Sequence, residues 1–178
     1  MDLFLARQKR VLFEEINMLP PGSLLEIGIG NGRYLKHYQA HSVVGIDNSE
    51  GMLKVAERNK TERVRLLLMN GESLQFENQS FDYVVLSHVI AVVGNADLLL
   101  DEIYRVLKSG GKILILNHFT PDNWLSIVDR TFKPFSSFFH FKSVFYIEDL
   151  PAIRKFKIIK VISVGRLSYF KLLIYEKP

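Results

Sequence analysis

The chain has 178 residues, of which 48% are hydrophobic and 24% are charged, ordinary values for one folded domain. It contains no cysteine, which excludes disulfides, thiolate zinc sites and cysteine nucleophiles. The formal charge of +4 is compatible with an anionic partner, and equally with an ordinary solvated surface. No run approaches the roughly 18 apolar residues that a membrane span requires, and no secretory signal is present, so we expect a cytoplasmic protein.

Helical and strand patterns alternate along the chain. Residues 1–19 are expected to form an N-terminal helix, because Leu5, Leu12 and Ile16 share one helical face. Short apolar runs predict strands at residues 24–29, 43–46, 63–69, 81–86 and 112–117. Further helices are expected at residues 32–39, 49–59 (with Ser49 as its N-cap) and 96–107. Two β-rich runs, 156–164 and 169–176, are expected to form a hairpin.

This order of elements predicts an α/β fold in one domain, residues 1–178. The sheet is expected to be mostly parallel with an antiparallel C-terminal hairpin and helices on both faces. In such a sheet ligands bind beyond the carboxyl ends of the strands, where the strand order reverses. Unusual polar residues and glycines follow those ends here: Gly28, Gly30, Asp47, Asn70, Gly71, Glu72, Ser87, His88, Asn117 and His118. Their convergence is stronger evidence for a binding site than any single motif.

The loop from Glu26 to Gly32 reads Glu-x-Gly-x-Gly-x-Gly. Glycines allow a tight turn and let backbone amides approach a ligand closely, although the loop alone could simply turn a strand into a helix. Asp47 ends the next strand, and its carboxylate can accept hydrogen bonds from two vicinal ribose hydroxyls. Arg33 stands where the dinucleotide pattern Gly-x-Gly-x-x-Gly has its last glycine. The loop and Asp47 therefore indicate a nucleotide-type pocket that differs from that of a dehydrogenase.

Nearly the whole chain resembles the class I S-adenosylmethionine-dependent methyltransferases. Leu25-Glu-Ile-Gly-Ile-Gly-Asn-Gly32 is similar to the first motif of that family, and Val44-Gly-Ile-Asp47 to the strand that ends in the ribose-binding acid. Residues 71–76 and 81–85 are similar to the segments before and within the fourth strand, and residues 102–112 to the turn before strand five. The resemblance implies a Rossmann-like seven-stranded methyltransferase sheet, methyl-transfer activity and S-adenosylmethionine as cofactor.

The same resemblance implies which residues bind the cofactor: Glu26, Gly28, Gly30, Asp47, Asn48, Met52, Asn70, Gly71, Glu72 and Ser87. Glu26 and the glycine loop would hold the methionine part, and Asp47 the ribose. Met52 would lie against the adenine or, alternatively, in the core. Asn70 stands where many members have an aspartate that contacts the adenine amino group; its side-chain oxygen can still accept that bond, without the charge.

His88 and His118 are the candidate catalytic residues, because both lie at the ligand-binding edge and can take or relay a proton. Each could instead be hydrogen-bonded in its loop with no catalytic role. Neither has a second ligand at suitable spacing, so no metal site is expected. After the fourth strand, base-amine methyltransferases carry an Asn/Asp-Pro-Pro-aromatic signature, whereas this chain has Ser87-His-Val-Ile90, which argues against nucleic acid as a partner.

An aromatic insertion, residues 119–148, is expected on the acceptor side of the site. Its rings are interleaved with basic residues, so those outside the core can line an apolar pocket or touch an anionic membrane. His88-Val-Ile-Ala-Val-Val93 and Ile115-Leu-Asn-His-Phe119 resemble soluble, membrane-associating bacterial phosphatidylethanolamine N-methyltransferases. The implied acceptor is a small molecule or lipid, with a phospholipid amine as the leading case and peripheral contact with an anionic membrane.

Other functions stay open from the sequence. Within the same fold, the alternative is C- or O-methylation of a quinone-like or small aromatic acceptor. From other classes, the alternatives are an NAD-type oxidoreductase and a non-catalytic protein that binds S-adenosylmethionine. The oligomeric state is likewise open.

Overall fold

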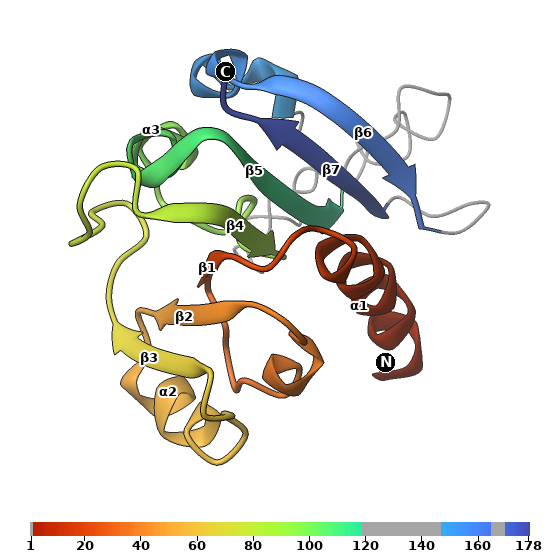
Figure 1. Ribbon diagram of the computed structural model, residues 1–178, viewed down its shortest axis with the longest axis vertical. Coiled ribbons are helices and arrows are strands. Elements are labelled where there is room, and N and C mark those ends of the chain that lie inside the picture. The colour runs from red at the N-terminus through yellow and green to blue at the C-terminus, as the bar shows by residue number, and fades with distance from the viewer. Residues whose placement is uncertain (1, 119–146, 165–169) are drawn as a thin grey trace, which may run out of the picture.

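Seven strands form one mixed sheet in the order β3-β2-β1-β4-β5-β7-β6 (Figure 1). The computed structural model describes residues 2–118, 147–164 and 170–178. The strands are β1 (Ser23–Ile27), β2 (Ser42–Asp47), β3 (Val64–Leu68), β4 (Phe81–Ser87), β5 (Leu107–His118), β6 (Lys157–Ser163) and β7 (Phe170–Glu176). Strands β1 to β5 are parallel, and β7 is antiparallel to both β5 and β6. The predicted Rossmann-like sheet with an antiparallel C-terminal hairpin is confirmed.

Helices cover both faces of this sheet, as Figure 1 shows for α1 (Asp2–Asn17) and α3 (Ala96–Val106). Leu12 and Ile16 of α1 are fully buried on one face. Leu99 and Ile103 of α3 are fully buried on the other. Because apolar side chains of the parallel strands pack on both faces, the strands read as nearly continuous apolar runs in the sequence.

Two helices begin at side-chain caps. Ser49 precedes α2 (Glu50–Ala56), and its hydroxyl accepts a hydrogen bond from the amide of Met52, which confirms the predicted N-cap. Asn95 precedes α3, and its side-chain oxygen accepts hydrogen bonds from the amides of Asp97 and Leu98. Such caps satisfy amides that the first turn of a helix leaves unpaired.

The expectation of a helix at residues 32–39 is wrong in extent, since only a 3₁₀ turn, η1 (Leu35–His37), forms there. Gly32 has a φ of +67°, a left-handed conformation in which a helix does not continue. The side-chain amide of Asn17, at the end of α1, donates a hydrogen bond of 2.9 Å to the carbonyl of His37. Contacts with α1 therefore stabilise this short turn, and no regular helix forms here.

Strand β5 begins five residues before the expected residue 112. Leu107 is already paired with Phe81 of β4, and both side chains are buried. Burial of these two side chains extends the strand backward through Ser109–Gly111, a segment that by itself resembles a turn.

The C-terminal hairpin and the region before it are described in part. Two 3₁₀ turns, η2 (Ile147–Asp149) and η3 (Pro151–Lys155), lead into β6. The predicted connection between β6 and β7, and residues 119–146 of the expected aromatic insertion, lie outside the described residues. Among the helices of the described part, none combines the length and the apolar character needed to cross a membrane.

The strand order places one point of the sheet in position to bind a ligand. From β1 the chain continues to β2 and β3 on one side, and it then crosses to β4 on the other side of β1. Open α/β sheets bind ligands beyond the carboxyl ends of strands at such a reversal. The residues that follow β1, β2 and β4 therefore lie where such a sheet binds its ligand.

Candidate functional site

A cavity of about 370 Å³ lies at this reversal. It contains most of the predicted cofactor residues: Gly28, Asp47, Asn48, Asn70, Gly71, Glu72 and Ser87. The candidate catalytic residue His88 also lines it, and Val89, Val92 and Val93 add an apolar wall. Glu26, Gly30, Met52 and His118 are not among its lining residues.

The glycine loop is held in place by backbone hydrogen bonds. The amides of Gly28 and Ile29 both donate to the carbonyl of Ile46, at 2.8 and 3.1 Å. Gly28 has a φ of +74°, and a Cβ at that position would lie 2.4 Å from Cγ2 of Val89. Any residue larger than glycine would be strained there and would clash with the cavity wall.

Asp47 connects the loop to the end of β2. Its Oδ2 accepts a hydrogen bond of 2.8 Å from the amide of Gly30, and its Oδ1 accepts one of 2.9 Å from the amide of Ser49. An ionised carboxylate offers about four lone-pair sites, so acceptor capacity remains on the cavity side. The two amides fix the orientation of the carboxylate and leave it able to bind a hydroxyl-bearing ligand.

The segment after β3 forms the opposite wall of the cavity. The side-chain oxygen of Asn70 accepts a hydrogen bond of 3.0 Å from the amide of Glu72. Oε1 of Glu72 in turn accepts one of 2.9 Å from the amide of Asn95, the cap of α3. Glu72 therefore ties this segment to the start of α3. The side-chain oxygen of Asn70 keeps a second lone pair for a ligand.

Unpartnered polar atoms mark the end of β4. The buried hydroxyl of Ser87 and the buried Nε2 of His88 have no hydrogen-bond partner among the described residues. Burial lowers the pKa of His88 from 6.5 to about 4, and the positive charge of Lys9 adds to the shift. The imidazole is therefore neutral at neutral pH and free to accept a hydrogen bond.

Phe170 of β7 brings the two candidate histidines into one cluster. Its ring lies edge-on to the imidazole of His88, with 5.6 Å between centroids, and edge-on to that of His118, at 5.4 Å. Both histidines therefore contact the same aromatic ring. Phe170 was not singled out from the sequence, because only the pairing of β5 with β7 places it beside these rings.

Glu26 and Met52 are not part of the cavity lining. Glu26 is only 4% exposed, and its carboxylate lies 3.5 Å from Nζ of Lys9 in α1. Burial raises the pKa of the nearby Tyr38 phenol well above its usual value, and the negative charge of Glu26 adds to that shift. Met52 is 48% exposed on α2, so it is not a core residue.

Comparison with known proteins identifies a family and several relatives. Residues 25–115 match the family described as "Methyltransferase domain". The chain is 30% identical to phosphatidylethanolamine N-methyltransferase of Cereibacter sphaeroides over 88% of this chain and 80% of that protein. It is 29% identical to a ubiquinone/menaquinone biosynthesis C-methyltransferase of Geotalea daltonii, over 82% of this chain and 61% of that protein. A 97-residue match to protein MJ1123 of Methanocaldococcus jannaschii, 36% identical, spans 54% of this chain and 45% of that protein.

A solved structure of a methyltransferase from Thermotoga maritima superimposes with a TM-score of 0.71. It covers 98% of this chain and 89% of that one, at 24% sequence identity. At this identity the likeness concerns the fold.

Proposed function

The chain belongs to the class I S-adenosylmethionine-dependent methyltransferases, and we propose that it methylates the amine of a lipid-like acceptor, with phosphatidylethanolamine as the leading case. The family implies S-adenosylmethionine as methyl donor. One observation carries the choice of acceptor: the relative named for phosphatidylethanolamine is matched over 80% of its length. The match to the quinone-ring relative leaves more than a third of that protein uncovered.

The residues around the main cavity fit the adenosyl part of this cofactor. We assign the ribose hydroxyls to Asp47, whose carboxylate is oriented by two amides and retains lone pairs. We assign the adenine amino group to Asn70 and the edge of the ring to the backbone of Gly71, both at the end of the cavity nearest β3. The buried, unpartnered hydroxyl of Ser87 supports a polar ligand at the other end, because buried polar groups normally find a partner.

His88 is suited to prepare an amine acceptor. The cofactor supplies an electrophilic methyl group on a sulfonium, and the protein aligns the nucleophile with it and excludes water. A lipid ammonium must lose a proton before its nitrogen can attack. With a pKa of about 4, the His88 imidazole stays neutral and its ring nitrogen can accept a hydrogen bond from the acceptor nitrogen, which orients the amine while the amine loses its proton to solvent. His118, which also contacts Phe170, is the second candidate for this role.

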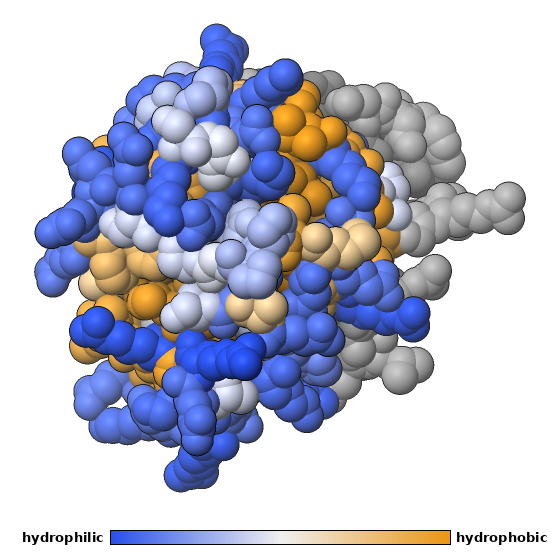
Figure 2. All heavy atoms as spheres, in the orientation of Figure 1, coloured by the Kyte–Doolittle hydropathy of each residue, from blue (hydrophilic) through white to orange (hydrophobic). Residues whose placement is uncertain are grey.

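The exposed surface of β6 supports contact with a bilayer. Ile158, Ile159 and Val161 are 46%, 46% and 54% exposed. Lys157 is exposed beside them, and Lys160 between them pairs with Glu15 of α1 at 2.7 Å. Figure 2 shows apolar side chains gathered over the β6–β7 hairpin. Apolar side chains interleaved with lysines suit the interface of a membrane that contains anionic lipids. We therefore propose that β6 meets the membrane from which the acceptor is taken.

Methylation of a quinone-like ring is the second candidate function. It is favoured by the match to the quinone C-methyltransferase over 82% of this chain. A ring carbon has no ammonium proton to lose, but a hydroxyl on the ring could donate a hydrogen bond to the neutral imidazole of His88.

An acceptor panel separates the two candidates. The full chain is incubated with S-adenosylmethionine and either phosphatidylethanolamine vesicles or a demethylated quinone in detergent, and the products are identified by mass spectrometry. We expect monomethylated phosphatidylethanolamine. Methylated quinone without methylated lipid would replace the proposal with the second candidate.

Vesicle sedimentation tests the membrane contact separately. Serine at both Ile158 and Val161 should reduce binding to vesicles that contain phosphatidylglycerol. Leu98→Ser is the matched control, because Leu98 is equally exposed (50%) but lies on α3. Equal loss of binding in both variants would remove β6 from the proposal.

A further inference from the structure

A largely buried ion pair joins α1 to β1 beside the glycine loop. Nζ of Lys9 lies 3.5 Å from Oε1 of Glu26, and the two side chains are 13% and 5% exposed. Glu26 is followed by Ile27 and Gly28, which line the main cavity. The charge of Lys9 also lowers the pKa of His88, at the end of β4. A cation and an anion are thus buried together next to the cofactor cavity, at the end where His88 lies.

This ion pair is loose for its degree of burial. Eight other ion pairs in the described part of the chain have nitrogen–oxygen distances between 2.6 and 2.9 Å. This is the range of a good charge-assisted hydrogen bond. Lys9 and Glu26 remain at 3.5 Å although removal from water is costly for both charges. A pair that serves only to neutralise two buried charges is expected to close. The longer distance leaves both groups able to take a further partner.

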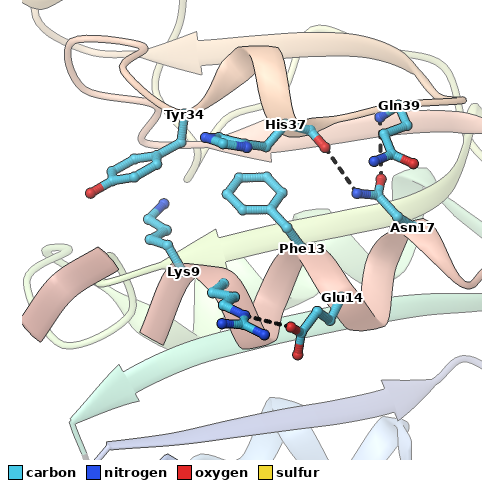
Figure 3. A pocket seen from close by; sticks show the side chains of 8 residues that line it. Lys9, Phe13, Glu14, Asn17, Tyr34, His37 and Gln39 are labelled. Atoms are coloured by element: carbon cyan, nitrogen blue, oxygen red, sulfur yellow. Dashed lines mark hydrogen bonds and ion pairs between the residues drawn. The ribbon is translucent and has the colours of Figure 1, made fainter. Parts of the chain in front are cut away.

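The surroundings of Lys9 hold its side chain without fixing the ammonium. Figure 3 shows Lys9 extending from α1 toward the ring of Tyr34, with Phe13 and His37 beside them. Nζ is 5.4 Å from the centroid of the Tyr34 ring, a cation–π contact that tolerates small displacements. These side chains line a groove of about 440 Å³ between α1 and η1. The ammonium can therefore shift toward a new anionic partner without losing its contacts.

We infer that Lys9 and Glu26 together bind the zwitterionic amino-acid end of the cofactor, with Lys9 taking its carboxylate and Glu26 its ammonium. The sequence had pointed to Glu26 alone. The inference rests on the cofactor of the proposed function and is independent of the acceptor. In the bound state four charges alternate in sign, so each of the two buried protein charges gains a partner.

The opposite role for Lys9 makes a different prediction. If Lys9 only neutralised Glu26, it would compete with the ammonium of the ligand for the same carboxylate. Removing Lys9 would then strengthen the binding of every ligand that carries an amine. If Lys9 binds the carboxylate of the ligand, removal of Lys9 weakens the binding only of ligands that carry a carboxylate.

Calorimetric titration with a matched pair of ligands distinguishes these roles. S-adenosylmethionine and decarboxylated S-adenosylmethionine share the sulfonium and the amine and differ only in the carboxylate. The wild-type protein should prefer S-adenosylmethionine by roughly 10- to 100-fold, the range expected when a hydrogen bond between charged groups is lost. Lys9→Gln should lose most of that preference, whereas Lys9→Arg should retain it.

Arg10→Gln is the matched control, because Arg10 is the neighbouring cation in α1 and pairs with Glu14 on the surface. Its preference should equal that of the wild type. If Lys9→Gln does not fold, Lys9→Met takes its place, because methionine keeps an unbranched side chain of similar length without the charge. Equal affinity of the wild type for both ligands, or tighter binding by Lys9→Gln, would overturn the inference and leave the methyltransferase assignment intact. Absence of binding of either ligand to the wild type would overturn both.

Discussion

The backbone amide of Gly30 donates a hydrogen bond of 2.8 Å to Oδ2 of Asp47. The two residues are 17 positions apart, and the proposal gives them different parts of the cofactor, the methionine and the ribose. The carboxylate that binds the ribose therefore also fixes the loop that surrounds the methionine part. Loss of this side chain should disturb both ends of the site.

Asp47→Ala should weaken the binding of S-adenosylhomocysteine at least 10-fold. Hydrogen bonds to a charged group contribute about 1.5–3 kcal/mol each, and about 1.4 kcal/mol corresponds to a factor of ten. Calorimetric titration measures the effect. Asp101→Ala is the control, because Asp101 forms an exposed ion pair with Lys155 away from the cavity. Unchanged affinity in Asp47→Ala would remove this residue from the site.

Alanine at Gly28 should destabilise the protein more than alanine at Gly30. Both glycines have a positive φ, but a Cβ at Gly28 meets Val89 at 2.4 Å whereas a Cβ at Gly30 meets no atom within 4 Å. The left-handed backbone alone costs about 1–2 kcal/mol, and overpacking adds about 1–3 kcal/mol. Urea unfolding of both variants gives the comparison. Equal losses would show that the contact with Val89 relaxes without cost.

The glycine loop and the cap of α2 could be predicted from the sequence because each is a local pattern of residues. The same is true of Asp47 at the end of its strand. The pairing of Lys9 with Glu26 could not be predicted, since it depends on which face of β1 meets α1. Residues near Leu35 gave a helical pattern that contacts with Asn17 overrule.

In the candidate site, too, local patterns could be predicted from the sequence, whereas contacts between distant segments could not. Asn70 and Ser87 follow strand ends and lie at the cavity as expected. Phe170 was missed, because an aromatic residue in a C-terminal strand carries no sign of which rings it will meet. Its position beside His88 follows from the antiparallel pairing of β7 with β5.

The low pKa of His88 should make stability depend on pH. Between 6.5, its ordinary pKa, and about 4, its value in the folded protein, the unfolded chain binds a proton at this residue that the folded protein does not. Stability is therefore lost as the pH falls through this range. The free energy of unfolding should drop more between about pH 7 and about pH 5 in the wild type than in His88→Asn.

Asparagine is the suitable substitute because His88 has a φ of +62°, which asparagine tolerates. Urea unfolding at each pH measures this free energy. An equal drop in the wild type and in His88→Asn would contradict the assignment of this pKa.

Arg105 of α3 should contribute to stability through its geometry as well as its charge. Its guanidinium donates hydrogen bonds of 2.7 and 2.8 Å to the carbonyls of Phe76 and Leu74 and pairs with Glu102 at 2.8 Å. It thereby holds the segment before β4 against the helix. Arg105→Lys keeps the charge but loses the planar set of donors, and it should cost about 1–3 kcal/mol.

The control for Arg105→Lys is Lys155→Ala, which removes an exposed ion pair on the same helix face and should cost no more than about 1 kcal/mol. Chemical denaturation measures both variants. Similar losses in the two would mean that the carbonyl contacts of Arg105 add little.

The central claim is that the cavity beyond β1, β2 and β4 binds S-adenosylmethionine, and thermal unfolding with competing ligands tests it most directly. At about 100 times its dissociation constant, a ligand of the folded state adds about 2.7 kcal/mol, which raises the melting temperature of a domain of this size by about 5–10 °C. S-adenosylhomocysteine should produce such a rise in the wild type and a much smaller one in Asp47→Ala, and NAD should produce none. A rise with NAD and none with S-adenosylhomocysteine would contradict the account.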